Sequence, residues 1–75
     1  MKKKYEALNL HQKIEFLIQE MVEKDILLKD ALREFEKIYI ETTSKKYQEN
    51  MTRVAKALGI HRNTLHNRVK SLKIK

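Results

Sequence analysis

The sequence predicts an all-α fold of four helices, in which a helical hairpin is followed by a C-terminal helix-turn-helix. Apolar residues recur every three or four positions along most of the chain, which places them on one face of a helix. Proline is absent and Gly59 is the only glycine, so a single position carries a strong helix-ending signal. We expect residues 1–75 to form one domain, with the hairpin over about residues 9–47 and the helix-turn-helix over about residues 50–73.

The first predicted helix begins after Asn9, and we expect residues 1–8 to form a basic arm before it. Asn9 and Gln12 have the spacing of a capping box, in which each side chain accepts a hydrogen bond from the other residue's backbone N–H. An apolar stripe then continues through the helix: Leu10, Ile14, Leu17, Ile18 and Met21. A helix lying on an anionic membrane is the alternative for such a stripe. Its polar face would then be rich in basic residues, but here it carries acids such as Glu15 and Glu20.

The second predicted helix follows a short connection at residues 24–27. We expect Asp25 or a neighbouring residue to cap its first turn. The helix should continue to about Tyr47, because no helix-breaking residue intervenes. Its apolar stripe steps by four, three and four residues: Leu28, Leu32, Phe35 and Tyr39.

The two apolar stripes are too wide to be hidden against each other within one copy of the chain. A chain of this length buries only roughly 60–65% of its unfolded surface, and without cysteine it has no disulfide to compensate. Two hairpins from two copies can bury both stripes in a four-helix core, although the periodicity alone also permits a different bundle. We therefore expect a homodimer with these interface residues: Leu10, Ile14, Leu17, Ile18, Met21, Leu28, Leu32, Phe35 and Tyr39.

Two short helices on either side of Gly59 form the predicted helix-turn-helix. Gly59 reaches the left-handed conformation that ends a helix without a Cβ clash, and Ile60 then fills the corner. Asn50 is the expected cap of the first of these helices. The apolar positions at helical spacing are Met51, Val54, Ala55 and Leu58 before the glycine, and Leu65, Val69 and Leu72 after it.

The second motif helix, expected over about residues 61–72, has an outer face rich in basic and amide side chains. From Lys45 onward the chain has nine Lys and Arg residues and a single acid, Glu49. Arg pairs with guanine and Asn with adenine in the major groove, so this composition predicts a recognition helix for double-stranded DNA. The expected DNA-binding residues are Asn50, Thr52, Arg53, His61, Arg62, Asn63, Thr64, His66, Asn67, Arg68 and Lys70.

Two roles are expected within this set. Asn50, Thr52, Arg53 and Thr64 lie beside helix N-termini, where unpaired N–H groups attract anions, and we assign them to phosphate positioning. Helix capping is the alternative for Asn50 and Thr64. Arg62, in the first turn of the second motif helix, is the best candidate to read a guanine.

The stretch NMTRVAKALGIHRNTLHNRVKSLKI resembles the DNA-binding module of the Fis (factor for inversion stimulation) family. The same module forms the C-terminal domain of many bacterial enhancer-binding activators of the nitrogen-regulation type. The resemblance extends over about Leu28 to Ile74 and rests on Asn50, Thr52, Ala55, Leu58, Gly59, Ile60, Arg62, Thr64 and Leu65. The chain departs from the family pattern at Glu49, where Gly is usual, at Val54, where Ala is usual, and at His61. The resemblance implies a Fis-like homodimer with a helix-turn-helix at each end. It also implies groove positions for His61, Arg62, Asn67 and Arg68.

Other function classes find little support in the sequence. His61 and His66 are five residues apart and no cysteine accompanies them, so no metal site is expected. Ser44 and Ser71 have no His–Asp partner nearby in the sequence and no glycine-rich phosphate loop is present, so no enzymatic activity or cofactor is expected. The longest aliphatic run, residues 26–28, is too short to span a membrane, and we expect a cytoplasmic, nucleoid-associated protein. The partners expected are DNA, a second copy and, for a domain of a larger activator, the rest of that activator. A helical interaction module without specific DNA binding is the main alternative. RNA binding is less favoured, because no aromatic stacking surface lies near the basic helix.

Overall fold

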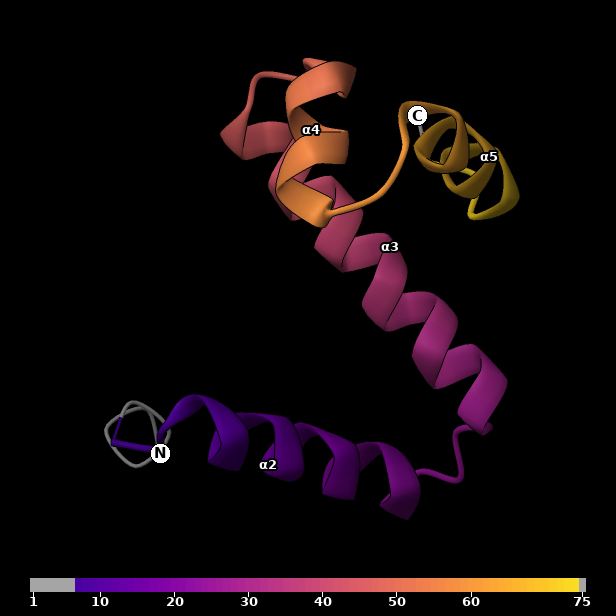
Figure 1. Ribbon diagram of the computed structural model, residues 1–75. Coiled ribbons are helices and arrows are strands. Elements are labelled where there is room, and N and C mark those ends of the chain that lie inside the picture. Colours follow the sequence, from indigo (N-terminus) through magenta and orange to yellow (C-terminus); the bar gives the residue numbers. More distant parts are fainter. Residues whose placement is uncertain (1–6, 75) are drawn as a thin grey trace. The chain divides into compact units, whose positions relative to one another are not determined.

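The computed structural model describes residues 7–74, and this part of the chain contains four α-helices and no β-strand. In chain order they are α2 (Leu10–Glu23), α3 (Leu28–Lys46), α4 (Met51–Leu58) and α5 (Arg62–Ser71), labelled as in Figure 1. The predicted all-α fold with a C-terminal helix-turn-helix is confirmed. The basic arm expected at residues 1–8 lies largely outside the described residues. Packing divides the chain into two units, one ending at Ala31 and one beginning at Leu32.

Helix α2 begins where the sequence predicted. The Asn9 side chain accepts a hydrogen bond from the Gln12 backbone N–H at 2.8 Å, and the Gln12 side chain accepts one from the Asn9 N–H at 3.0 Å. These reciprocal bonds form the predicted capping box and satisfy two of the N–H groups that a helix start leaves without an intrahelical partner.

Asp25 ends α2, so of the expected caps for α3, Asp25 or a neighbouring residue, Asp25 is not the one used. Its backbone is left-handed, with φ of 58°, and its N–H donates to the Val22 carbonyl at 3.0 Å. The N–H of Ile26 donates to the Met21 carbonyl at 3.1 Å. These two bonds define the Schellman ending of a helix. The residue directly before α3 is Leu27, whose side chain has no acceptor for a cap.

The same ending recurs after the other three described helices. The left-handed residues are Gln48, Gly59 and Lys73, with φ of 54°, 74° and 57°. The residue after each one donates its N–H to the carbonyl five positions earlier: Glu49 to Ser44 at 2.7 Å, Ile60 to Ala55 at 3.0 Å and Ile74 to Val69 at 3.0 Å. The prediction for Gly59 is confirmed, whereas the other three endings are made without glycine.

The second unit has a small apolar core beneath the helix-turn-helix. Its buried side chains are Ile40, Val54, Ala55, Leu65 and Leu72, and Val54 and Leu65 are fully enclosed. Met51, Leu58, Ile60 and Val69 pack partly buried around them, as expected, together with Tyr47 and Ile74. α3 contributes Ile40, so the motif is built on the C-terminal half of that helix.

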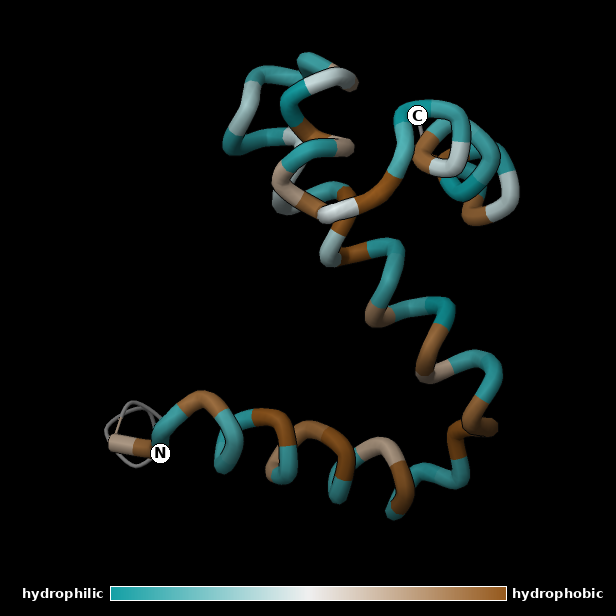
Figure 2. The backbone as a smooth tube through the Cα atoms, in the orientation of Figure 1, coloured by the Kyte–Doolittle hydropathy of each residue, from teal (hydrophilic) through white to brown (hydrophobic). Residues whose placement is uncertain are grey.

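The apolar stripes of α2 and α3 remain exposed in the single chain. Figure 2 shows hydrophobic and hydrophilic bands alternating along both helices. The exposed members of the predicted interface include Leu10 and Leu28, at 75% and 74%, and also Leu17, Ile18, Leu32, Phe35 and Tyr39. Ile14 and Met21 are half-buried. Within one copy, therefore, neither stripe forms a core comparable to the one beneath the motif.

Candidate nucleic-acid interface

The outer face of α5 combines exposure with unpaired polar side chains. Leu65, Val69 and Leu72 turn its inner face toward the core. The exposed residues outside that face include Arg62, Asn63, His66, Asn67 and Lys70. None of these five side chains makes a hydrogen bond or ion pair with another residue in the range 7–74. Their donors and acceptors are thus free to meet a ligand.

The N-terminal ends of α4 and α5 differ in how they are capped. The Asn50 side chain accepts a hydrogen bond from the Arg53 backbone N–H at 3.2 Å, as predicted. His61 precedes α5 in an extended conformation and makes no such side-chain bond. Thr52, Arg53 and Thr64, in the first turns of the two helices, are exposed. The residues expected at phosphates therefore lie at two accessible helix starts.

Arg68 differs from the other candidate DNA-binding residues, because it already has a partner on α3. Its Nε lies 3.2 Å from a carboxylate oxygen of Glu36. One turn further along α5, the Ser71 carbonyl accepts a hydrogen bond from Arg33 Nη2 at 3.0 Å. These contacts tie the C-terminal half of α5 to the middle of α3.

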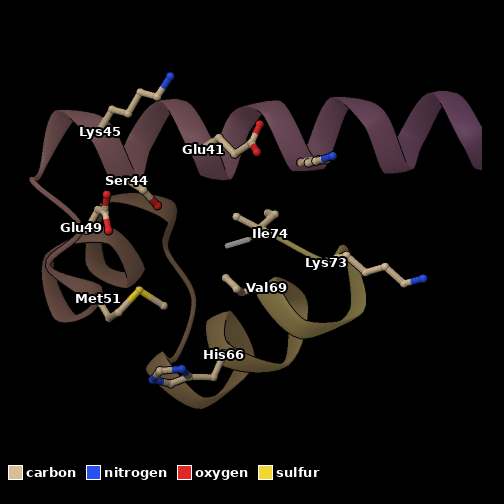
Figure 3. A pocket seen from close by; sticks show the side chains of 10 residues that line it. Glu41, Ser44, Lys45, Glu49, Met51, His66, Val69, Lys73 and Ile74 are labelled. Atoms are coloured by element: carbon tan, nitrogen blue, oxygen red, sulfur yellow. The ribbon is translucent and has the colours of Figure 1, made fainter.

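A groove of about 710 Å³ lies between the C-terminal half of α3, the turn before α4, and α5. Figure 3 shows Met51, Val69 and Ile74 along its inner wall and charged side chains around it. Those side chains mix acids, Glu41 and Glu49, with lysines. The two carboxylates offset part of the positive charge of the lysines, whereas the outer face of α5 has no carboxylate, so that face is the better surface for DNA.

The chain matches the family described as "Bacterial regulatory protein, Fis family" over residues 31–72, which is more than half of its length. It belongs to the Fis family. The match covers the second unit almost entirely, including α4, the turn at Gly59 and α5. This Fis-family chain is therefore a DNA-binding regulator of the helix-turn-helix class. No curated protein and no solved structure matches it.

The described residues offer neither a metal-binding cluster nor a membrane-spanning helix. Residues 7–74 contain no group of three or more His, Asp or Glu side chains placed to hold a metal ion. No helix among them is both long and apolar enough to cross a bilayer.

Sequence reasoning missed the residues of α3 that hold the motif. Arg33, Glu36 and Ile40 are spaced by three and four residues and so share one face of the helix. This face is distinct from the Leu32, Phe35 and Tyr39 stripe. Because Ile40 is the only apolar residue of the three, hydrophobic periodicity reveals the Leu32, Phe35 and Tyr39 stripe but not this face. The available signal was a second set of helically spaced residues that are mostly charged.

Proposed function

We propose that this protein binds specific sequences in double-stranded DNA as a homodimer, and thereby regulates transcription or shapes DNA. The observation that carries the proposal is the outer face of α5, where guanidinium and amide side chains are exposed and unpaired within residues 7–74. These are the groups that pair bidentately with guanine and adenine in the major groove. Arg62, in the first turn, is the proposed reader of guanine.

The phosphate contacts are assigned to the starts of α4 and α5. Arg53 and Thr52 lie beside the Asn50 cap, and Thr64 lies in the first turn of α5. Helix N-termini carry partial positive charge and N–H groups that favour anions. Phosphate contacts fix the orientation of a protein on the duplex without reading its sequence. His61, at the N-cap of α5, is proposed to lie at the groove edge beside Arg62.

A second copy is the proposed occupant of the exposed apolar stripes. A contiguous apolar surface on a soluble chain marks an interaction site, and both α2 and α3 carry one. The buried core of the second unit comprises only five residues, so association offers a substantial gain in apolar burial. Pairing also brings two recognition helices to one duplex. That arrangement raises affinity beyond what the few base pairs under a single helix supply.

Selection from a random duplex pool, followed by footprinting on the selected sequence, tests this function. We expect one enriched site with two related half-sites, bound at least a thousandfold more tightly than random DNA at the same salt concentration. Enrichment of a single unpaired half-site would contradict the dimeric mechanism. A chain that self-associates yet shows no salt-dependent affinity for any duplex would instead be an interaction module.

A further inference from the structure

Two polar contacts connect the middle of α3 to the C-terminal half of α5. Glu36 pairs with Arg68 at 3.2 Å, and Arg33 donates to the Ser71 carbonyl at 3.0 Å. Along α3, Arg33 comes three residues before Glu36, but its partner Ser71 comes three residues after Arg68 on α5. The two contacts therefore join helices that run in opposite directions. We call this set the α3–α5 clamp: Arg33, Glu36, Arg68 and the Ser71 carbonyl.

The apolar core holds α5 by its inner face only. Leu65 and Leu72 are buried beneath it, but apolar contacts are not directional, and both residues lie on the inner face. The clamp adds two directional contacts on the flank of the helix. Arg33 also places a cation at the C-terminal end of α5, where the helix dipole is negative and the last carbonyls lack intrahelical partners.

We propose that Glu36 and Arg33 are positioning residues for the recognition helix, and that Arg68 stays bound to Glu36 when DNA is present. The inference rests on the proposed reading of DNA by α5. Base readout requires side chains held within about 0.5 Å and 10–20° of the productive geometry. A rotation of α5 about its own axis would shift Asn63, Asn67 and Lys70 across the DNA major groove. The clamp opposes that rotation.

The competing assignment, and the one the sequence predicted, makes Arg68 a direct DNA contact. In that case Glu36 competes with DNA for the guanidinium, and removing the carboxylate strengthens binding to every duplex. If Arg68 is instead part of the clamp, removing the carboxylate weakens binding to the selected site. The two assignments therefore predict opposite signs for Glu36→Gln.

The test measures the affinity of the full chain for two duplexes of equal length, the selected site and a random sequence, at several salt concentrations. We expect Glu36→Gln and Arg68→Gln each to weaken binding to the selected site by about two- to fivefold, the range open to a partly exposed ion pair. Glu34→Gln is the matched control. Glu34 is an exposed carboxylate on the same helix with no ion pair inside residues 7–74, and its loss changes the net charge equally.

The charge swap Glu36→Arg with Arg68→Glu provides the rescue. The swapped pair restores the clamp and is expected to recover the affinity for the selected site, whereas a phosphate contact at residue 68 would be lost and replaced by repulsion. The NMR signal of the Arg68 Nε–H supplies a second readout. It should move in Glu36→Gln, stay in place in Glu34→Gln, and remain at its free-protein position when the selected duplex is added.

Three outcomes would overturn the inference while leaving the proposed function intact. They are tighter binding of Glu36→Gln to both duplexes, a salt slope lowered by about one in Arg68→Gln, and a swap variant weaker than either single variant. Failure of the unmutated protein to prefer any duplex is a different result. It would overturn the proposed function, and the positioning role with it. Circular dichroism melts of every variant establish that a loss of affinity is not a loss of folding.

Discussion

Within residues 7–74, the residues with positive φ lie at the ends of the helices. Gln48 and Glu49 are consecutive left-handed residues, with φ of 54° and 61°, and neither is glycine. A side chain in this conformation brings Cβ close to the following carbonyl, at a cost of roughly 1–2 kcal/mol per residue. The turn between α3 and α4 is therefore the most strained loop in residues 7–74. Its position matters because it sets where the Asn50 cap begins the motif.

Glu49→Gly should stabilise the protein. Glycine adopts φ of 61° without strain, and the gain is partly offset by the greater freedom of glycine in the unfolded chain. We expect the free energy of unfolding to rise by about 0.5–1 kcal/mol, measured by urea denaturation at fixed protein concentration. A fall in stability would show that the Glu49 side chain contributes more than its backbone costs.

Gly59→Ala is the matched reverse of that substitution. A Cβ at Gly59 would meet no atom within 4 Å, so only the left-handed backbone, with φ of 74°, opposes alanine. Because alanine also has less freedom than glycine in the unfolded chain, we expect the free energy of unfolding to fall by about 0.5–1 kcal/mol in the same urea denaturation. An unchanged stability would show that the left-handed conformation at this position costs alanine little.

Arg62→Ala tests whether the Arg62 side chain recognises a base. If Arg62 pairs with a guanine, the variant should lose about 1–3 kcal/mol of binding free energy on the selected duplex and much less on a random one. Arg53→Ala is the comparison, because Arg53 lies at the start of α4 and is assigned to a phosphate. It should weaken both duplexes alike and lower the slope of log affinity against log salt by about one. Equal losses on both duplexes for Arg62→Ala would make Arg62 a phosphate contact.

At the scale of elements, α3 has two faces with different tasks. Arg33, Glu36 and Ile40 contact the motif, and Ile40 is 3% exposed. Leu32 and Phe35, on the other face, are exposed in the single chain at 60% and 48%. One face of α3 thus contacts the motif, and another carries exposed apolar side chains. α3 therefore links the recognition helix to whatever covers its second face.

The cap of α4 provides an element-scale prediction. Asn50→Ala removes the acceptor for the Arg53 N–H, and we expect the free energy of unfolding to fall by about 1 kcal/mol. Asn67→Ala is the same chemical change on the exposed face of α5, where the side chain makes no hydrogen bond within residues 7–74 and alanine has the higher helix propensity. It should leave stability equal or slightly raised. A thermal melt distinguishes the two, and equal losses would contradict the capping role of Asn50.

The sequence could predict those elements whose signals are local. The Asn9 and Gln12 capping box, the Asn50 cap and the Gly59 turn each depend on residues within a few positions, and all three are confirmed. The ends of α2 and α3 lie within a residue or so of the predicted positions, but the left-handed conformation of Gln48 and Lys73 could not be predicted, because neither residue type favours it. Contacts between distant residues, such as Arg33 with Ser71, have no local signal at all.

At the scale of the whole molecule, the family assignment and the exposed surface concern different parts of the chain. The Fis-family match begins at residue 31, so α2 lies outside it. The helix-turn-helix and Ile40 account for the buried core of the described residues, whereas α2 and the exposed face of α3 add no buried side chain to it. The proposed paired recognition of DNA therefore depends on self-association through these exposed side chains.

The effect of Leu32→Asp on the free energy of unfolding distinguishes a dimer from a monomer, because Leu32 is 60% exposed in the single chain. In a monomer an aspartate at this exposed position should change the free energy of unfolding by no more than about 0.5 kcal/mol. In a dimer it buries a carboxylate without a partner, which costs several kcal/mol, and we expect the variant to unfold. The melting temperature of the unmutated protein should likewise rise with protein concentration, as mass action requires. A melting temperature that is constant over a hundredfold dilution, with a monomer mass by sedimentation and a stable Leu32→Asp variant, would exclude the homodimer. The paired half-site mechanism depends on that homodimer, so it would be excluded by the same results.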